Sequence, residues 1–168
     1  MILVQEMDAG PVLAQEEFDV SLIEIPETYY KKGFEIGNRL LIDVLPKYLS
    51  GEVKGFEQDD SLATYSGPLS RDNGKIDWNK SAVEIERMVR AYTPWPGTWT
   101  EVFVDNEGKI HLEKEMAERL NLPFENKDWD GVHRKRMKIL SAVLEGDQVV
   151  LDKVQMEGSV SVSFEKLV

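Results

Sequence analysis

The chain has 168 residues, of which 42% are hydrophobic and 30% charged, a balance that excludes a wholly disordered protein. It contains no cysteine, so disulfide bonds and thiolate metal sites are excluded, and its apolar runs are too short to span a membrane. The formal net charge of −11 argues against non-specific binding of polyanions, so any contact with nucleic acid requires a local basic patch.

Residues 1–25 are predicted to form two or three short strands. The apolar runs 2–4 and 12–14 lie on either side of a turn at residues 7–11, and residues 20–25 alternate in polarity. An unpaired strand edge can hydrogen-bond with another chain, so this segment is a candidate site of self-association. A chain that begins directly in a buried strand also indicates that part of the same fold lies upstream of Met1.

A long helix is predicted over residues 29–50, because apolar residues recur on one face at the helical period. Pro46 lies inside this pattern and should kink or loosen the last turn, and Gly51 should end the helix. The predicted apolar face comprises Phe34, Leu41, Val44, Leu45 and Tyr48.

Residues 55–77 combine many turn-forming residues with few periodic apolar positions, so they are predicted to be an extended linker and a domain boundary. A second helix is predicted from Ser81 to about Tyr92. Ser81 and Glu84 have the spacing of a capping box, in which each side chain bonds the other residue's free backbone N–H. The run at residues 94–97, Pro-Trp-Pro-Gly, should end this helix.

Beyond residue 98 the pattern changes from helical to extended. Strands are predicted at residues 99–104, 109–112, 137–144, 148–154 and 160–164, with a short helix at 112–120. Short strands with one helix suit a small open barrel of the OB type, although periodicity does not distinguish a barrel from a sandwich. The predicted fold class is α+β: a partial α/β unit followed by a small OB-like β-barrel domain.

Three stretches resemble one family, in the same order and at similar spacing. Residues 6–15, which contain Met-Asp-Ala-Gly-Pro, are similar to the loop that closes the catalytic domain of methionyl-tRNA formyltransferases. Residues 63–65 and 74–78 look like the interdomain stretch of that family, where a tyrosine and an Ile-Asp-Trp step recur. Residues 90–97 resemble the start of its C-terminal barrel, and two later segments, 137–140 and 154–158, are similar to its strands.

The resemblance implies a division of the chain. Residues 1–54 would be the C-terminal end of the formyltransferase catalytic domain, residues 55–77 a linker, and residues 78–168 the C-terminal OB-like domain. The resemblance also implies the reaction, in which a formyl group moves from 10-formyltetrahydrofolate to the amino group of methionyl initiator tRNA. This is a cytoplasmic step of translation initiation in protein biosynthesis.

The same resemblance makes Asp8 the catalytic aspartate, whereas an Asp before Ala-Gly-Pro taken by itself is most simply a turn former. The asparagine, the histidine and the folate-binding segment that complete the family's active site have no counterpart in this sequence. Their place would lie before Met1. We therefore expect no cofactor bound to this chain, and little or no formyl transfer by the chain alone.

One dense basic cluster is a candidate contact for tRNA phosphates; it comprises Arg134, Lys135, Arg136 and Lys138. The alternative is a solvated face that balances a very acidic protein. Trp95 could stack on a nucleobase, although packing at the domain junction is the favoured interpretation. His111 and His133 have no ligand partner three or four residues away, so no metal site is predicted.

Two other functions remain open at this point. Related enzymes formylate amino-sugars with a similar catalytic domain and barrel, and the substrate would separate them from this chain. The chain could also be a non-catalytic tRNA-binding module. Binding of tRNA without activity would support that function.

Overall fold

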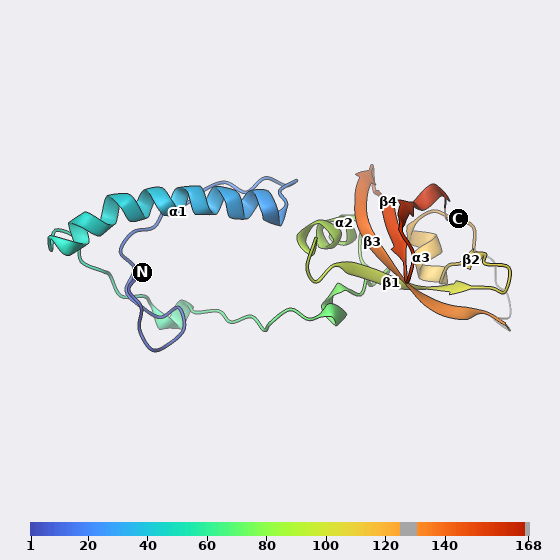
Figure 1. Cartoon of the computed structure of the whole chain (residues 1–168), viewed down its shortest axis with the longest axis horizontal. Coiled ribbons are helices and arrows are strands. Elements are labelled where there is room, and N and C mark those ends of the chain that lie inside the picture. Colours follow the sequence, from blue (N-terminus) through green and yellow to red (C-terminus); the bar gives the residue numbers. More distant parts are fainter. Residues whose placement is uncertain (125–130, 167–168) are drawn as a thin grey trace. The chain divides into compact units, whose positions relative to one another are not determined.

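The computed structural model describes residues 1–124 and 131–166 (Figure 1). Two compact units are present, Met1–Gly67 and Pro68–Val168, and each is described by itself. The boundary between them lies within the segment 55–77, for which the sequence predicts a linker. The assignment of residues 1–54 to the end of a catalytic domain stays a prediction.

The first unit is built around one long helix, α1 (Pro26–Leu49), which confirms the helix predicted at residues 29–50. Pro26 is tolerated in the first turn because the N–H that proline lacks has no partner there. The helix continues past Pro46, so this proline does not end it. No residue of α1 is buried, and Phe34 remains 70% exposed. None of the described helices is both long and apolar enough to cross a membrane.

The strands predicted within residues 1–25 are wrong. This segment is irregular, and it meets Phe56 only through an isolated bridge, in which Val12 N and Phe56 N each donate to the other residue's carbonyl, at 2.9 and 3.0 Å. Leu3, which was predicted to lie in a strand, is 92% exposed. A strand needs a neighbour along its length to satisfy its backbone groups, and the described first unit offers this segment no such neighbour. Self-association through residues 1–25 stays a prediction.

The second unit begins with a short 3-10 helix, η2 (Arg71–Gly74), followed by helix α2 (Ala82–Ala91), which lies close to the predicted bounds. The predicted capping box is confirmed: Ser81 N donates to Glu84 Oε2 at 3.0 Å, and Glu84 N donates to Ser81 Oγ at 3.2 Å. Two backbone N–H groups at the start of the helix are thereby satisfied. Ile85 and Val89 recur one turn apart and are buried, so α2 presents one apolar face to the core.

An antiparallel sheet forms the rest of this unit. Its strands are β1 (Thr98–Val104), β2 (Ile110–His111), β3 (His133–Glu145), β4 (Gln148–Met156) and β5 (Ser161–Ser163). The spatial order is β2-β1-β3-β4-β5, and the short helix α3 (Lys114–Arg119) follows β2 in the chain. The β3–β4 register shifts between Ile139 and Ala142, an irregularity that bends a strand. These elements confirm the predicted strands, the short helix and the α+β class with an OB-like half-barrel.

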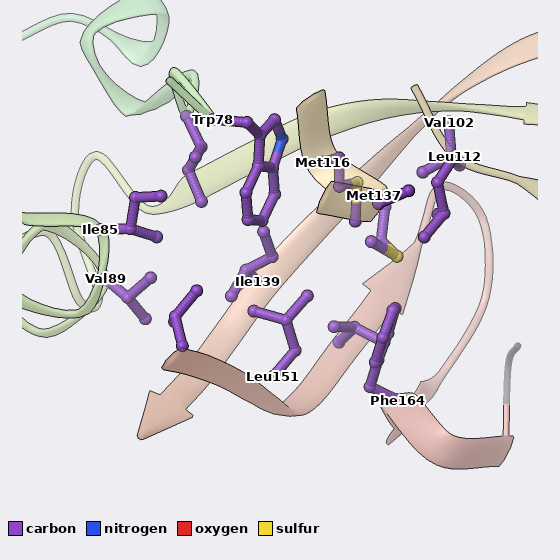
Figure 2. Packing of buried hydrophobic residues seen from close by; sticks show 14 of the residues in the cluster. Trp78, Ile85, Val89, Val102, Leu112, Met116, Met137, Ile139, Leu151 and Phe164 are labelled. Carbon is purple, nitrogen blue, oxygen red and sulfur yellow. The ribbon is translucent and has the colours of Figure 1, made fainter. Parts of the chain in front are cut away.

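The core lies between the inner face of this sheet and the two short helices. Figure 2 shows Ile85 and Val89 of α2 toward one end of the cluster, with Met116 of α3 beside Met137 toward the other. Trp78 lies among them, 5% exposed, and its Nε1 donates to Thr100 Oγ1 at 2.8 Å. Trp78 is therefore a packing residue of the core.

Candidate functional site

The face of β1 and β3 that points away from the core carries both cations and aromatic rings. Side chains alternate between the two faces of a strand, and the even-numbered residues of β1 pack in the core, so its odd-numbered residues point outward. Antiparallel pairing places basic residues of β3 opposite them. The pairs are Trp99 with Lys138, Glu101 with Arg136, and Phe103 with Arg134. We call these six residues the outer face.

Cations cover the aromatic rings of the outer face. The guanidinium carbon of Arg136 lies 4.0 Å from the centroid of the Trp99 ring, and Lys75 Nζ lies 5.4 Å from the same centroid. The guanidinium carbon of Arg134 lies 5.5 Å from the centroid of Phe103. The negative faces of the rings attract these charges, so the rings hold the long basic side chains near the sheet. Trp99 itself is only 8% exposed.

One carboxylate lies among these cations. Glu101 Oε2 is 2.8 Å from Lys75 Nζ and 3.5 Å from an Arg134 guanidinium nitrogen. The hydrogen bond from Lys75 lowers the pKa of Glu101, and the charges of Lys75, Arg134 and Arg136 lower it further. Because this pKa is lowered in the folded state, the Lys75–Glu101 ion pair stabilises the fold at pH values above the ordinary carboxyl pKa. That stability is lost as pH falls through the lowered value.

A cavity of about 350 Å³ adjoins the outer face. It lies between the turn at residues 93–97, which follows α2, and strands β1 and β3. Trp95 is 56% exposed in this turn, and the Arg71 guanidinium carbon lies 5.9 Å from the centroid of its ring. Its predicted role in packing the domain junction stays a prediction. The cavity is lined by Arg71, Thr93, Pro94, Trp95, Pro96, Gly97, Thr98, Trp99, Arg136, Lys138, Ile139, Leu140 and Gln155.

The segment before α2 is fastened to this region through Trp99. The Nε1 of Trp99 donates to the Arg71 carbonyl at 2.8 Å, and Ile76 N donates to the Trp99 carbonyl at 2.9 Å. Gly74 lies between these two contacts and is buried. A Cβ at Gly74 would lie 1.9 Å from the carbonyl oxygen of Gly97, so only glycine allows the two backbones to approach this closely.

Replacing Gly74 by alanine should therefore destabilise the second unit by about 1–3 kcal/mol, the usual cost of forcing extra volume into a packed site. The measurement is urea unfolding followed by circular dichroism. Gly67→Ala is the matched control, because a Cβ there meets nothing within 4 Å and Gly67 does not have a positive φ. Equal stability of the two variants would contradict the close approach.

The basic cluster predicted from the sequence is divided by the sheet. Arg134, Arg136 and Lys138 lie together on the outer face. Lys135 instead pairs with Val102, which is fully buried, so its side chain leaves β3 on the core-facing side, where it remains exposed. A contact between Lys135 and RNA stays a prediction, and the geometry separates it from the other three.

The aromatic residues of the outer face were not predicted as site residues from the sequence. Trp99 and Phe103 were visible only as strand residues, and Lys75 only as part of a linker. The odd-numbered positions of β1 could have been grouped with Arg134 and Arg136 if the register of β1 on β3 were known. The signal was therefore present, but it depended on a pairing between distant segments.

Asp8, the predicted catalytic residue, lies in the first unit on an exposed turn. Its φ of 57° is in the left-handed region, which asparagine and aspartate tolerate better than other side chains. Gln58 Nε2 donates to the carbonyls of Asp8 and Gly10 at 2.7 and 2.9 Å, so the turn is held from the segment after α1. Asp8 lines a cavity of about 580 Å³ with Phe56 and Tyr65.

The described residues contain no group of three or more histidine or acidic side chains that could hold a metal ion. The second unit offers hydrogen-bonding cations, aromatic rings that lie under cations, and a small mixed cavity. In the first unit, the carboxylate of Asp8 can accept a proton or orient a neighbouring group.

The second unit is a five-stranded antiparallel half-barrel, closed by two short helices and carrying cations over aromatic rings. This arrangement defines an OB-like domain of the α+β class. Residues 68–167 match the family model described as formyl transferase, C-terminal domain. This match covers more than half of the chain, so the protein belongs to that family.

Relatives named methionyl-tRNA formyltransferase are similar to this chain over 99 or 100 residues. The protein from Chloroflexus aurantiacus is 44% identical over 100 residues, which is 60% of this chain and 32% of the relative. The proteins from Nitratidesulfovibrio vulgaris and Myxococcus xanthus are 37% identical over 99 residues and 38% identical over 100 residues. The chain covers about a third of the length of these relatives, between 30% and 32%.

Proposed function

We propose that this chain is the C-terminal part of a methionyl-tRNA formyltransferase, and that its second unit contacts initiator methionyl-tRNA through the outer face. The observation that carries the proposal is the grouping of Arg134, Arg136 and Lys138 on one side of β3. Arginine and lysine are the usual partners of backbone phosphates, and such contacts position a protein on RNA without reading its sequence. A protein of net charge −11 needs a local patch of this kind.

The whole enzyme would transfer a formyl group from 10-formyltetrahydrofolate to the amino group of the methionine carried by the tRNA, in the cytoplasm, during translation initiation. In that reaction Asp8 would accept or relay the proton of the attacking amine, or orient a histidine that does so. The names of the relatives favour methionyl-tRNA over an amino-sugar as the substrate.

The isolated chain should carry out little or no formyl transfer. Attack on a formyl carbonyl also needs donors that stabilise the oxyanion, together with a site that holds the folate. The family supplies these groups from an asparagine, a histidine and a folate-binding segment that have no counterpart in these 168 residues. Robust turnover by this polypeptide alone, with 10-formyltetrahydrofolate and methionyl initiator tRNA, would contradict the proposal.

Titration of the chain with initiator tRNA at two salt concentrations tests the contact. Three phosphate contacts give a salt slope of about −2.7, so raising salt from about 50 to about 200 mM should weaken binding about 40-fold. Fluorescence anisotropy of end-labelled tRNA measures this change. Absence of binding at the lower salt concentration would refute the proposed role of the outer face.

Glu101→Gln should strengthen the same binding by about two- to five-fold. The carboxylate competes with phosphates for Lys75 and Arg134, and an exposed pair of this type is worth no more than about 1 kcal/mol. The measurement is the same titration at the lower salt concentration. Glu113→Gln, outside the outer face, is the control; weaker binding by Glu101→Gln than by this control would contradict the competition.

A further inference from the structure

The cavity beside the outer face differs from the rest of the surface in the charge of its lining. Arg71, Arg136 and Lys138 contribute to it, and no carboxylate is found among the described residues that line it. The chain as a whole has 31 acidic and 20 basic residues, so an acid-free lining with several cations is not an average sample of its surface. Such a lining favours an anionic ligand.

Trp95 supplies an exposed aromatic surface in the same cavity. Trp99 is covered by Arg136 and 8% exposed, so its ring offers little area to a ligand, whereas Trp95 is 56% exposed. The Arg71 guanidinium carbon lies 5.9 Å from the centroid of the Trp95 ring, and a cation–π contact at an exposed site is worth only about 0.5–1 kcal/mol. A flat ring stacked on this face of Trp95 would therefore displace a weakly held neighbour.

The dimensions and the remaining groups suit one nucleotide. A cavity of about 350 Å³ lies at the small end of the range of ligand pockets, roughly 300–1,000 Å³. Gln155 lines it; its Nε2 donates to the Ser159 carbonyl at 2.8 Å, and its Oε1 can accept from the edge of a base. Arg136 and Lys138 belong to both the cavity and the outer face, so an RNA backbone on that face would pass the mouth of the cavity.

We infer that this cavity binds one unpaired nucleotide of a bound RNA, with its base stacked on Trp95 and its phosphate on Arg136 and Lys138. The inference rests on the proposed function, because the same cations hold the RNA backbone. It adds a specific requirement, namely that the RNA presents a base free of its stack. Base-paired RNA of equal charge would use the outer face and leave the cavity empty.

The test compares a single-stranded RNA hexanucleotide with a blunt-ended RNA duplex, using the full chain and fluorescence anisotropy of labelled RNA. Trp95→Ala should weaken binding of the hexanucleotide about ten-fold, as expected for the loss of one stacked base, and change duplex binding less than two-fold. Trp95→Phe, which keeps a flat ring, should restore most of the affinity. Tyr30→Ala, which removes an exposed aromatic ring from α1, should change neither.

Three results would overturn the inference. Equal loss of hexanucleotide and duplex binding by Trp95→Ala would show a general effect rather than stacking, provided that thermal unfolding of the variant matches the parent. Unchanged hexanucleotide binding by Trp95→Ala would show that the cavity is not used, while salt-sensitive binding of initiator tRNA would still support the proposed function. Absence of all tRNA binding by the parent chain would remove the proposed function together with the inference.

Discussion

Replacing Arg134, Arg136 and Lys138 together by alanine is expected to lower the affinity for initiator tRNA by about a thousand-fold or more. Each side chain is exposed on one side of β3 and can reach a phosphate. A charge-assisted hydrogen bond contributes about 1.5–3 kcal/mol, and 1.4 kcal/mol is about a factor of ten, so three contacts give at least this loss.

The salt dependence distinguishes this outcome from a general loss of affinity. Each phosphate contact contributes about −0.9 to the slope of log affinity against log salt, so the triple variant should reduce the steepness of that slope by about 2.7. The same anisotropy titration, repeated at several salt concentrations, gives this slope directly. A large affinity loss with an unchanged slope would contradict direct phosphate contact.

Two control variants make the result specific to the outer face. Replacing Lys114, Lys153 and Lys166 by alanine removes the same charge from exposed positions elsewhere in the second unit. This control should weaken binding by less than about ten-fold, since distant charges act only through the screened field. The single variant Lys135→Ala tests the residue that the sheet places on its other side. A loss with Lys135→Ala as large as with Arg136→Ala would contradict the division of the cluster.

Arg136 also covers Trp99, so the fold of the triple variant must be checked before its affinity is interpreted. Exposed cation–π contacts are worth about 0.5–1 kcal/mol, which is small beside the stability of a domain of this size. Thermal unfolding of the triple variant should therefore remain cooperative, with a slightly lower midpoint. Loss of the transition would make its affinity uninformative, and the uncharged Arg136→Gln would then replace Arg136→Ala.

Ile85→Ala is expected to destabilise the second unit by about 2–5 kcal/mol. Ile85 is 0% exposed and lies on the face of α2 that packs against the sheet (Figure 2). Truncation removes buried methyl groups and leaves a cavity that neighbours on both α2 and β3 can fill only in part. Urea unfolding, followed by the circular dichroism of the sheet, gives the loss in free energy of unfolding.

Val83→Ala provides the matched control on the same helix. Val83 is 38% exposed, so its truncation should change stability by no more than about 0.5 kcal/mol. Alanine has a slightly higher helix propensity than isoleucine or valine, so this effect acts in the same direction in both variants. Similar stability of Ile85→Ala and Val83→Ala would mean that α2 does not close the half-barrel.

Elements defined by local chemistry were predictable from the sequence. Helix α2 was located by a capping box at Ser81 and Glu84 together with its apolar period, and both signals lie within one short segment. The hairpin between β1 and β2 was located by its turn. There Asp105 Oδ1 accepts from the backbone N–H groups of Glu107 and Lys109, at 3.0 and 2.8 Å. Interactions over a few residues leave a readable pattern because the same residues both form and terminate the element.

The candidate site was predictable only in part. Charge density alone singled out the basic residues of β3, and a family resemblance singled out Asp8, whose catalytic role stays a prediction. The aromatic rings that lie under these cations were not predicted from the sequence as part of the site. Trp99 and Phe103 are separated from Arg134 and Arg136 by about 35 residues of sequence, and strand register is set by turn geometry and by which face is buried.

The sequence by itself determined the α+β class, the order of the elements from the first helix onward and the face that α2 turns toward the core. Only the tertiary structure decided that residues 1–25 form no strands, that Lys135 is separated from its basic neighbours, and that Trp95 lines a cationic cavity. The physical reason is the same in each case. Capping and periodicity are local, whereas strand pairing and the faces that it creates depend on partners that lie far away in the chain.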